Sequence, residues 1–188
     1  MNMLQKIISE KDLAWDKHSG NTIENFSVQI SDNASNELRD NHQLITNLEE
    51  TFPILQKEIL GFKNKFLIGG IGFFVIDGKC FSDFSREETI GIYNKICKAL
   101  GTLYVQNIKN EKFVVIKDEG KSMMSGGRYH QTKEGGSFHT DSPQWNKVPD
   151  FVGLCCVNPA KKGGESKFVS AYSIHNEILK EHKHFLKI

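Results

Sequence analysis

A histidine and a carboxylate stand two residues apart at His139-Thr140-Asp141. Side chains of an extended chain alternate between two faces, so residues i and i+2 project from one face and can reach the same ion. A neutral imidazole nitrogen and a hard carboxylate oxygen suit Fe(II), and a second histidine would complete a facial triad. His139 and Asp141 are therefore candidate metal ligands. The same spacing also occurs at ordinary surface turns, so the neighbouring sequence has to decide.

The residues around this pair form an ordered set of motifs. A loop rich in Gly and Ser at 118–137 precedes FHTD at 138–141, which is followed by VPDFVGLCCV at 148–157 and GGESKFVSA at 163–171. Upstream stands GGIGFFVIDGKCFSDFSREETIGIYNKICKALGTL at 69–103. This set resembles the TauD/TfdA (clavaminate synthase-like) family of Fe(II)/2-oxoglutarate-dependent dioxygenases, and the resemblance covers about residues 65–175.

The resemblance implies roles for three residues. His139 and Asp141 match the proximal iron ligands of the family. Ser166 stands where the family usually has a threonine, whose hydroxyl helps to hold the 2-oxoglutarate carboxylate, and serine can donate the same hydrogen bond. A plain hydroxyl at the start of a strand is the alternative for Ser166. The implied activity is hydroxylation or desaturation of a small, amino-acid-like substrate with dioxygen, releasing succinate and CO2.

Other candidates carry weaker signals. Arg128 could meet an anionic group of the substrate, or it could be a solvated arginine of the loop. Phe138 and Trp145 flank the ligands and could wall the site or pack in a core. The pair Gly70-x-Gly72 looks like part of a phosphate-binding loop, but it lacks the rest of a nucleotide motif, so backbone crowding explains it better.

Two further elements of the family pattern are missing from the C-terminal part of this sequence. The family has a distal histidine and an arginine for the far 2-oxoglutarate carboxylate, both well downstream of the GGET-like motif. All arginines here precede Asp141: Arg39, Arg86 and Arg128. Three tail histidines are weak alternatives for the third ligand: His175, His182 and His184. The sequence is therefore expected to be the N-terminal piece of a longer enzyme.

Two other functions stay open at this point. One is a truncated, non-catalytic remnant, and the other is a cupin-like metal-binding protein that uses one of the tail histidines. A downstream reading frame with a histidine and then an arginine about ten residues later would favour the oxygenase.

The helices and strands expected around these residues indicate an α+β fold. Its core is expected to be a double-stranded β-helix (jelly roll), incomplete here. We expect an N-terminal extension with helices at 1–60 and a partial jelly-roll domain at 61–188. Helices are predicted at 32–47 (capped by Asp32 or Ser35), 51–60 (ended by Gly61), 85–100 (with a Ser85/Glu88 capping box) and 173–186. Strands are predicted at 66–76, 103–106, 113–117, 151–157 and 167–171. Without a facing sheet, 151–157 would expose apolar surface and open edges, which favours self-association.

Composition limits the function classes. The 188 residues are 38% hydrophobic and 25% charged, as in ordinary globular proteins. A net charge of +1 gives no reason to expect nucleic-acid binding. The longest apolar stretch, 66–76, is broken by glycine and short of the roughly 20 residues that span a bilayer, so no membrane segment and a cytoplasmic location are expected. The four cysteines are expected to be buried free thiols.

Overall fold

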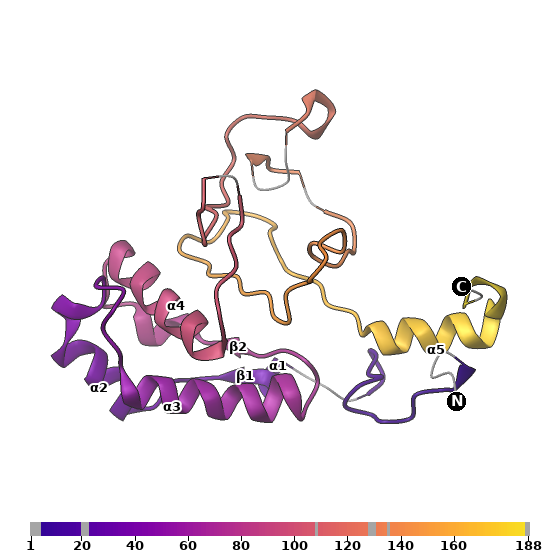
Figure 1. The fold of residues 1–188 in the computed structure, drawn as a ribbon, viewed down its shortest axis with the longest axis horizontal. Coiled ribbons are helices and arrows are strands. Elements are labelled where there is room, and N and C mark those ends of the chain that lie inside the picture. The colour runs from indigo at the N-terminus through magenta and orange to yellow at the C-terminus, as the bar shows by residue number, and fades with distance from the viewer. Residues whose placement is uncertain (1–4, 20–22, 108, 128–130, 135, 187–188) are drawn as a thin grey trace. The chain divides into compact units, whose positions relative to one another are not determined.

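The computed structural model describes residues 5–19, 23–107, 109–127, 131–134 and 136–186. The chain divides into two compact units (Figure 1). The first unit consists of Met1–Leu100 together with Phe168–Ile188, and the second of Gly101–Lys167. The boundary predicted at residue 60 separates an N-terminal extension from a partial jelly-roll domain. The division into compact units does not test that boundary, which stays a prediction.

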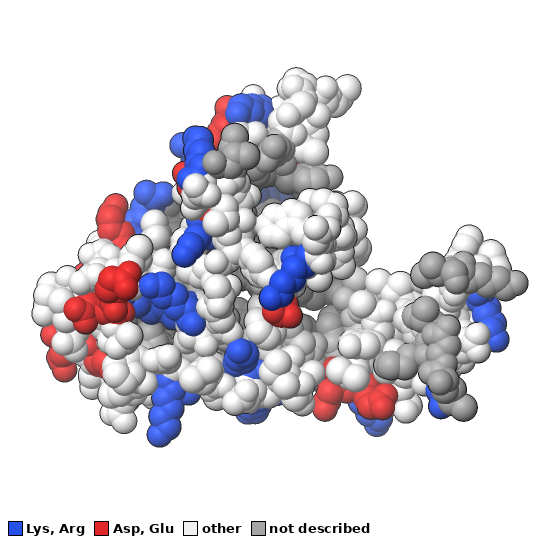
Figure 2. Space-filling model, in the orientation of Figure 1, with Lys and Arg blue, Asp and Glu red and all other residues white. Residues whose placement is uncertain are grey.

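Three helices of the first unit enclose its hydrophobic core: α2 (Asp32–Asp40), α3 (Pro53–Phe62) and α4 (Arg86–Leu100). The buried core consists of Ile30, Ala34, Leu38, Ile45, Phe52, Leu55, Ile59, Ile92, Ile96 and Ala99. Beside it, α1 (Ile23–Phe26) leads into β1 (Ser27–Val28), which pairs in parallel with β2 (Val75–Ile76). The turn η2 (His42–Leu44) lies between α2 and α3 in the chain. Figure 2 shows acidic and basic side chains interspersed over the visible face.

Two glutamates cap the helices α2 and α3 reciprocally. The N-cap of α2 is Ser31, whose hydroxyl accepts from the Ala34 N–H at 3.2 Å, so the predicted caps Asp32 and Ser35 were wrong. The Glu58 carboxylate of α3 accepts from the N–H and hydroxyl of this Ser31, at 2.8 and 2.9 Å. In return, the Glu37 carboxylate of α2 accepts the free N–H groups at the start of α3, from Ile54 at 3.0 Å and Leu55 at 2.9 Å. These bonds satisfy helix-terminal donors that have no partner within the helix.

The capping box predicted for α4 is confirmed. The Ser85 N–H donates to the Glu88 carboxylate at 2.8 Å, and the Glu88 N–H donates to the Ser85 hydroxyl at 3.2 Å. The buried residues of α4 are Gly91, Ile92, Asn94, Lys95, Ile96 and Ala99. Lys95 can be buried because its ammonium group donates to the carbonyls of Asn47 and Glu50.

The predicted strand at 66–76 is wrong for most of its length. α3 does not end at Gly61 but runs to Phe62 and continues as the π-helical turn η3 (Lys63–Ile68). Residues four apart share one helix face, which lets Phe62 and Phe66 both pack on Phe74, with ring centroids 5.8 and 6.0 Å away. This tertiary contact outweighs the β-propensity of the segment. Only Val75–Ile76 forms a strand, and the turn η4 (Gly78–Phe81) follows it.

The jelly-roll core is not shown. Among the residues described in the second unit, none lies in a strand, and one short turn, η5 (Met123–Ser125), is formed. The expected strands at 103–106, 113–117 and 151–157 are irregular chain, as is 167–170 of the strand expected at 167–171, whose last residue begins the helix α5 (Ala171–Glu181). The turn between the first two does form, since Gln106 N–H donates to the Glu111 carbonyl at 2.7 Å. A strand needs a continuous hydrogen-bonding neighbour along its edge and an apolar layer against one face. No strand pairing is formed by the described residues of these segments.

The described residues of the second unit include no buried apolar side chain. Among its described residues the buried one is Thr132. Its exposed large apolar side chains are Val105, Val114, Val115, Ile116, Met124, Phe138, Val148, Val152 and Leu154. None of the four cysteines forms a disulfide, but Cys155 and Cys156 are exposed and the other two are half-buried, so the predicted burial of the thiols was wrong. The apolar surface expected at 151–157 is present.

The C-terminal helix α5 (Ala171–Glu181) confirms the helix predicted at 173–186 in its main part, and the turn η7 (Lys183–Leu186) follows it. Ser170 caps this helix, because its hydroxyl accepts from the Ser173 N–H at 3.2 Å. No helix among the described residues is long and apolar enough to cross a membrane.

Candidate metal centre

The side chains of His139 and Asp141 converge. The His139 Nε2 lies 3.7 Å from the Asp141 Oδ1, and the two side chains are 59% and 51% exposed. These residues lie in irregular chain rather than in a strand. The i, i+2 spacing nevertheless brings both polar ends to one point, and their role as metal ligands stays a prediction.

The backbone carbonyl of Ser137 orients the histidine. It lies 2.7 Å from the His139 Nδ1, close enough to accept a hydrogen bond from that nitrogen. A proton held on Nδ1 leaves Nε2 with a free lone pair, which is the tautomer that a metal ion requires. The nitrogen nearest to Asp141 is thus the one that can coordinate. Sequence reasoning missed Ser137, because a backbone carbonyl is present in every residue and leaves no signal in the sequence.

The donor set fits two positions on Fe(II). Donors at adjacent corners of an octahedral ion with bonds of about 2.1 Å lie about 3 Å apart, so the 3.7 Å separation needs only a small rotation of exposed side chains. A third protein ligand is not brought to them: within the described ranges, no group of three His, Cys, Asp or Glu side chains could hold one ion.

The tail histidines belong to the first unit, whereas His139 and Asp141 belong to the second. The His175 Nε2 lies 3.1 Å from the carbonyl oxygen of Lys6. The exposed rings of His182 and His184 lie 6.2 Å apart. His175 therefore contacts the main chain of Lys6, and the rings of His182 and His184 contact each other.

The other residues that the sequence suggested for the site are Ser166, Phe138, Trp145 and Arg128. Ser166 is exposed and lies in irregular chain, so the strand that it was expected to begin is not formed. Phe138 is 65% exposed, which excludes the core-packing alternative for it in this structure. The half-buried ring of Trp145 lies 6.2 Å from that of Tyr104. Arg128 lies outside the described residues. The roles of Ser166 and Arg128 stay predictions.

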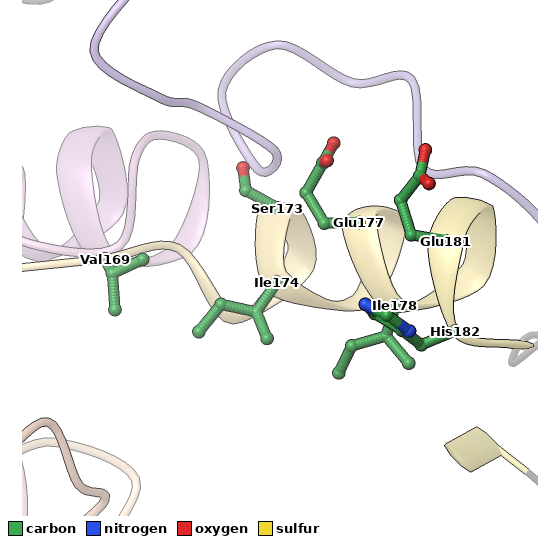
Figure 3. Close-up of a pocket in the computed structure, with 7 residues that line it drawn as sticks. All are labelled: Val169, Ser173, Ile174, Glu177, Ile178, Glu181 and His182. Atoms are coloured by element: carbon green, nitrogen blue, oxygen red, sulfur yellow. The ribbon is translucent and has the colours of Figure 1, made fainter.

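A hollow of about 400 Å³ runs along α5 (Figure 3). Its lining is Val169, Ser173, Ile174, Glu177, Ile178, Glu181 and His182. Neither His139 nor Asp141 lines it, and its walls are mainly apolar side chains of one helix. It is therefore not the candidate metal centre.

Comparison with known proteins decides the family. The sequence model described as Taurine catabolism dioxygenase TauD, TfdA family matches residues 67–188, which is more than half of the chain. The chain belongs to the TauD/TfdA family. It is also 31% identical over 114 residues to FR-33289 synthase from Streptomyces rubellomurinus (strain ATCC 31215), an alignment that covers 60% of this chain and 32% of that protein. No solved structure matches the chain.

These findings bear directly on the sequence predictions. The matched family is one of Fe(II)/2-oxoglutarate-dependent oxygenases with a jelly-roll-type fold, as the motifs indicated. The chain aligns with about a third of the length of the curated relative. His139, Asp141 and Ser166 all lie within the matched residues.

Proposed function

We propose that this chain supplies two iron ligands, His139 and Asp141, and a co-substrate contact, Ser166, to an Fe(II)/2-oxoglutarate-dependent oxygenase. The enzyme would hydroxylate or desaturate a small, amino-acid-like substrate and release succinate and CO2. The observation that carries the proposal is the convergence of His139 Nε2 and Asp141 Oδ1 at 3.7 Å, within the residues that match the family.

Each residue has a distinct role in this proposal. Fe(II), when bound together with 2-oxoglutarate, supplies the oxidation of the substrate, coupled to decarboxylation of the co-substrate. His139 offers a neutral nitrogen because the Ser137 carbonyl holds the proton on Nδ1. Asp141 offers a hard, negatively charged oxygen. The Ser166 hydroxyl donates a hydrogen bond to a carboxylate of 2-oxoglutarate, a contribution of about 1 kcal/mol.

Two ligands hold a metal ion only weakly, so the proposal has a consequence for these 188 residues. The third ligand and the arginine of the family pattern are proposed to come from further chain. An arginine binds a carboxylate through two charge-assisted hydrogen bonds, and without it 2-oxoglutarate would bind weakly and without a fixed orientation. We therefore expect the 188-residue chain alone to give negligible 2-oxoglutarate turnover.

The test is iron-dependent succinate release from the chain extended by its downstream coding sequence. The extended protein should be active, and His139→Ala or Asp141→Asn should abolish the activity. Asp150→Asn, which changes an exposed aspartate of the same unit, is the matched control and should stay active. Ser166→Ala should raise the KM for 2-oxoglutarate about fivefold, as expected for one lost hydrogen bond.

Two results would contradict the proposal. Activity that survives His139→Ala in the extended protein would remove this residue from the metal site. Robust, iron-dependent succinate release by the 188-residue chain would mean that a tail histidine supplies the third ligand after all.

A further inference from the structure

One side-chain amide of α5 binds both main-chain groups of a residue near the N-terminus. The Ile8 N–H donates to the Asn176 Oδ1 at 2.8 Å, and the Asn176 Nδ2 donates to the Ile8 carbonyl at 2.7 Å. Asn176 is only 9% exposed. A buried amide that forms both bonds at normal lengths is satisfied and fixes the register of the peptide that it binds.

Three more side chains from the same part of the chain contact this N-terminal segment, residues 5–16, here called the strap. The Ser173 hydroxyl donates to the Trp15 carbonyl at 2.6 Å, and the Ser170 hydroxyl donates to the Leu13 carbonyl. His175 adds its contact with the carbonyl of Lys6. All of these bonds use main-chain atoms of the strap, so they recognise the backbone rather than particular side chains.

Aromatic rings anchor the C-terminal end of the strap. The Trp15 indole N–H donates to the Ile71 carbonyl at 3.0 Å, and its ring lies 5.6 Å from that of Phe73. Phe73 in turn stacks on Phe168, with centroids 4.7 Å apart and planes at 9°. Because Phe168 stands two residues before the N-cap Ser170, the strap is fixed at the point where α5 begins.

The two sides of α5 differ in chemistry. Figure 3 shows Ser173, Glu177 and Glu181 on one side of the helix, and Ile174, Ile178 and His182 on the other. The strap contacts Ser173 and therefore lies along the polar side. A peptide held there keeps its main chain hydrogen-bonded while Ser9, Glu10 and Lys11 stay exposed.

We propose that the polar side of α5, formed by Ser170, Ser173 and Asn176, is a binding site for a peptide main chain, and that the strap is its ligand. The strap precedes the residues that match the family, 67–188, whereas α5 lies within them. A segment outside the family match thus clamps the last helix inside it. Because the backbone is recognised, replacing exposed strap side chains should be tolerated, and removing one N–H should not.

The first test uses two proline variants of the full chain. Ile8→Pro deletes the N–H that donates to Asn176, whereas the matched control Ser9→Pro changes the neighbouring exposed residue. Trypsin should cleave after Lys11 about tenfold faster in Ile8→Pro than in the wild type, and at the wild-type rate in Ser9→Pro. Asn176→Ala should release the strap like Ile8→Pro, and it reports on the contact without any change in the strap itself.

The second test restores the contact in trans. A labelled synthetic peptide of residues 5–16 should bind the Ile8→Pro chain but not the wild type, whose own strap competes at high effective concentration. The same peptide with alanine at Ser9, Glu10 and Lys11 should bind equally well, and the peptide N-methylated at Ile8 should not bind. Equal cleavage of the two proline variants, absence of peptide binding, or binding that N-methylation leaves unchanged would each overturn the proposal.

Discussion

Replacing Gly91 in α4 by alanine sets two effects of opposite sign against each other. In the interior of a helix, alanine is favoured over glycine by about 1 kcal/mol. At Gly91, however, a Cβ atom would lie 2.8 Å from the carbonyl oxygen of Ile45 and 2.9 Å from its Cγ2. Ile45 is fully buried in the core, so neither its side chain nor its backbone can move freely. Overpacking of this kind costs about 1–3 kcal/mol.

Because the closest contact is with a backbone oxygen, the steric cost should lie in the upper part of that range, about 2–3 kcal/mol. It then outweighs the helix-propensity gain, and Gly91→Ala should lower the free energy of unfolding by about 1–2 kcal/mol. The assay is urea denaturation followed by helical circular dichroism, because α2, α3 and α4 contribute most of the helix that packs around Ile45. A lower midpoint at an unchanged slope would report a change in stability rather than in the denatured state.

Gly61→Ala in α3 is the matched control. A Cβ at Gly61 would meet nothing within 4 Å, so only the helix propensity acts there, and the variant should be more stable by up to about 1 kcal/mol. If Gly91→Ala were as stable as the wild type, or stabilised like Gly61→Ala, the close packing of α4 against Ile45 would be refuted.

Three further predictions concern particular side chains. Glu37→Ala should destabilise the first unit by about 1 kcal/mol in the same denaturation assay, because two N–H donors of α3 lose their partner, and Glu37→Gln should cost less. Hydrogen bonds from Ser85, aided by His42, lower the pKa of Glu88. The contribution of Glu88 is therefore present above its ordinary pKa and lost as pH falls through the lowered one, so the stability of the wild type relative to Glu88→Gln should fall between about pH 6 and pH 3. Iodoacetamide should label the peptide with the exposed Cys155 and Cys156 before that with the half-buried Cys80, and mass spectrometry of timed samples would show the reverse order if the account is wrong. Burial raises the thiol pKa of both Cys155 and Cys80, so the expected order rests on the difference in exposure.

The helices were largely predictable because their signals are local. The bonds between Ser85 and Glu88 join residues three apart, and the sequence alone contains both partners. The α2 cap was not predictable in this way. Ser31 takes that position while Glu58, 27 residues away, binds its N–H and hydroxyl. A contact at such separation has no trace in the neighbouring sequence.

The strand predictions failed for a different physical reason. The segment 151–157 is rich in apolar residues, but apolar composition specifies burial only where another layer of chain covers it. In this structure Val152 and Leu154 remain exposed. At 66–76, packing of Phe66 on Phe74 favours a helical turn instead. Each of these outcomes depends on long-range partners rather than on local propensity.

The convergence of the two candidate ligands was predictable from the sequence, and their surroundings were not. The spacing of His139 and Asp141 indicated that the two side chains could reach one point, and their atoms lie 3.7 Å apart. The hydrogen-bond partner of the imidazole, the Ser137 carbonyl, follows from the path of the backbone. The contacts around His139 and Asp141 could therefore be identified only from the structure.

The most direct test of the account is to find which residues bind a divalent metal first. Mn(II), which replaces Fe(II) without reacting with dioxygen, broadens the NMR signals of nuclei near it, so the histidine ring signals of the 188-residue chain can be followed during a titration. The account predicts that the His139 signals broaden at the lowest Mn(II) concentration and that Asp141→Asn weakens this effect, whereas Asp150→Asn does not. Broadening of His182 and His184 ahead of His139, unaffected by Asp141→Asn, would contradict it.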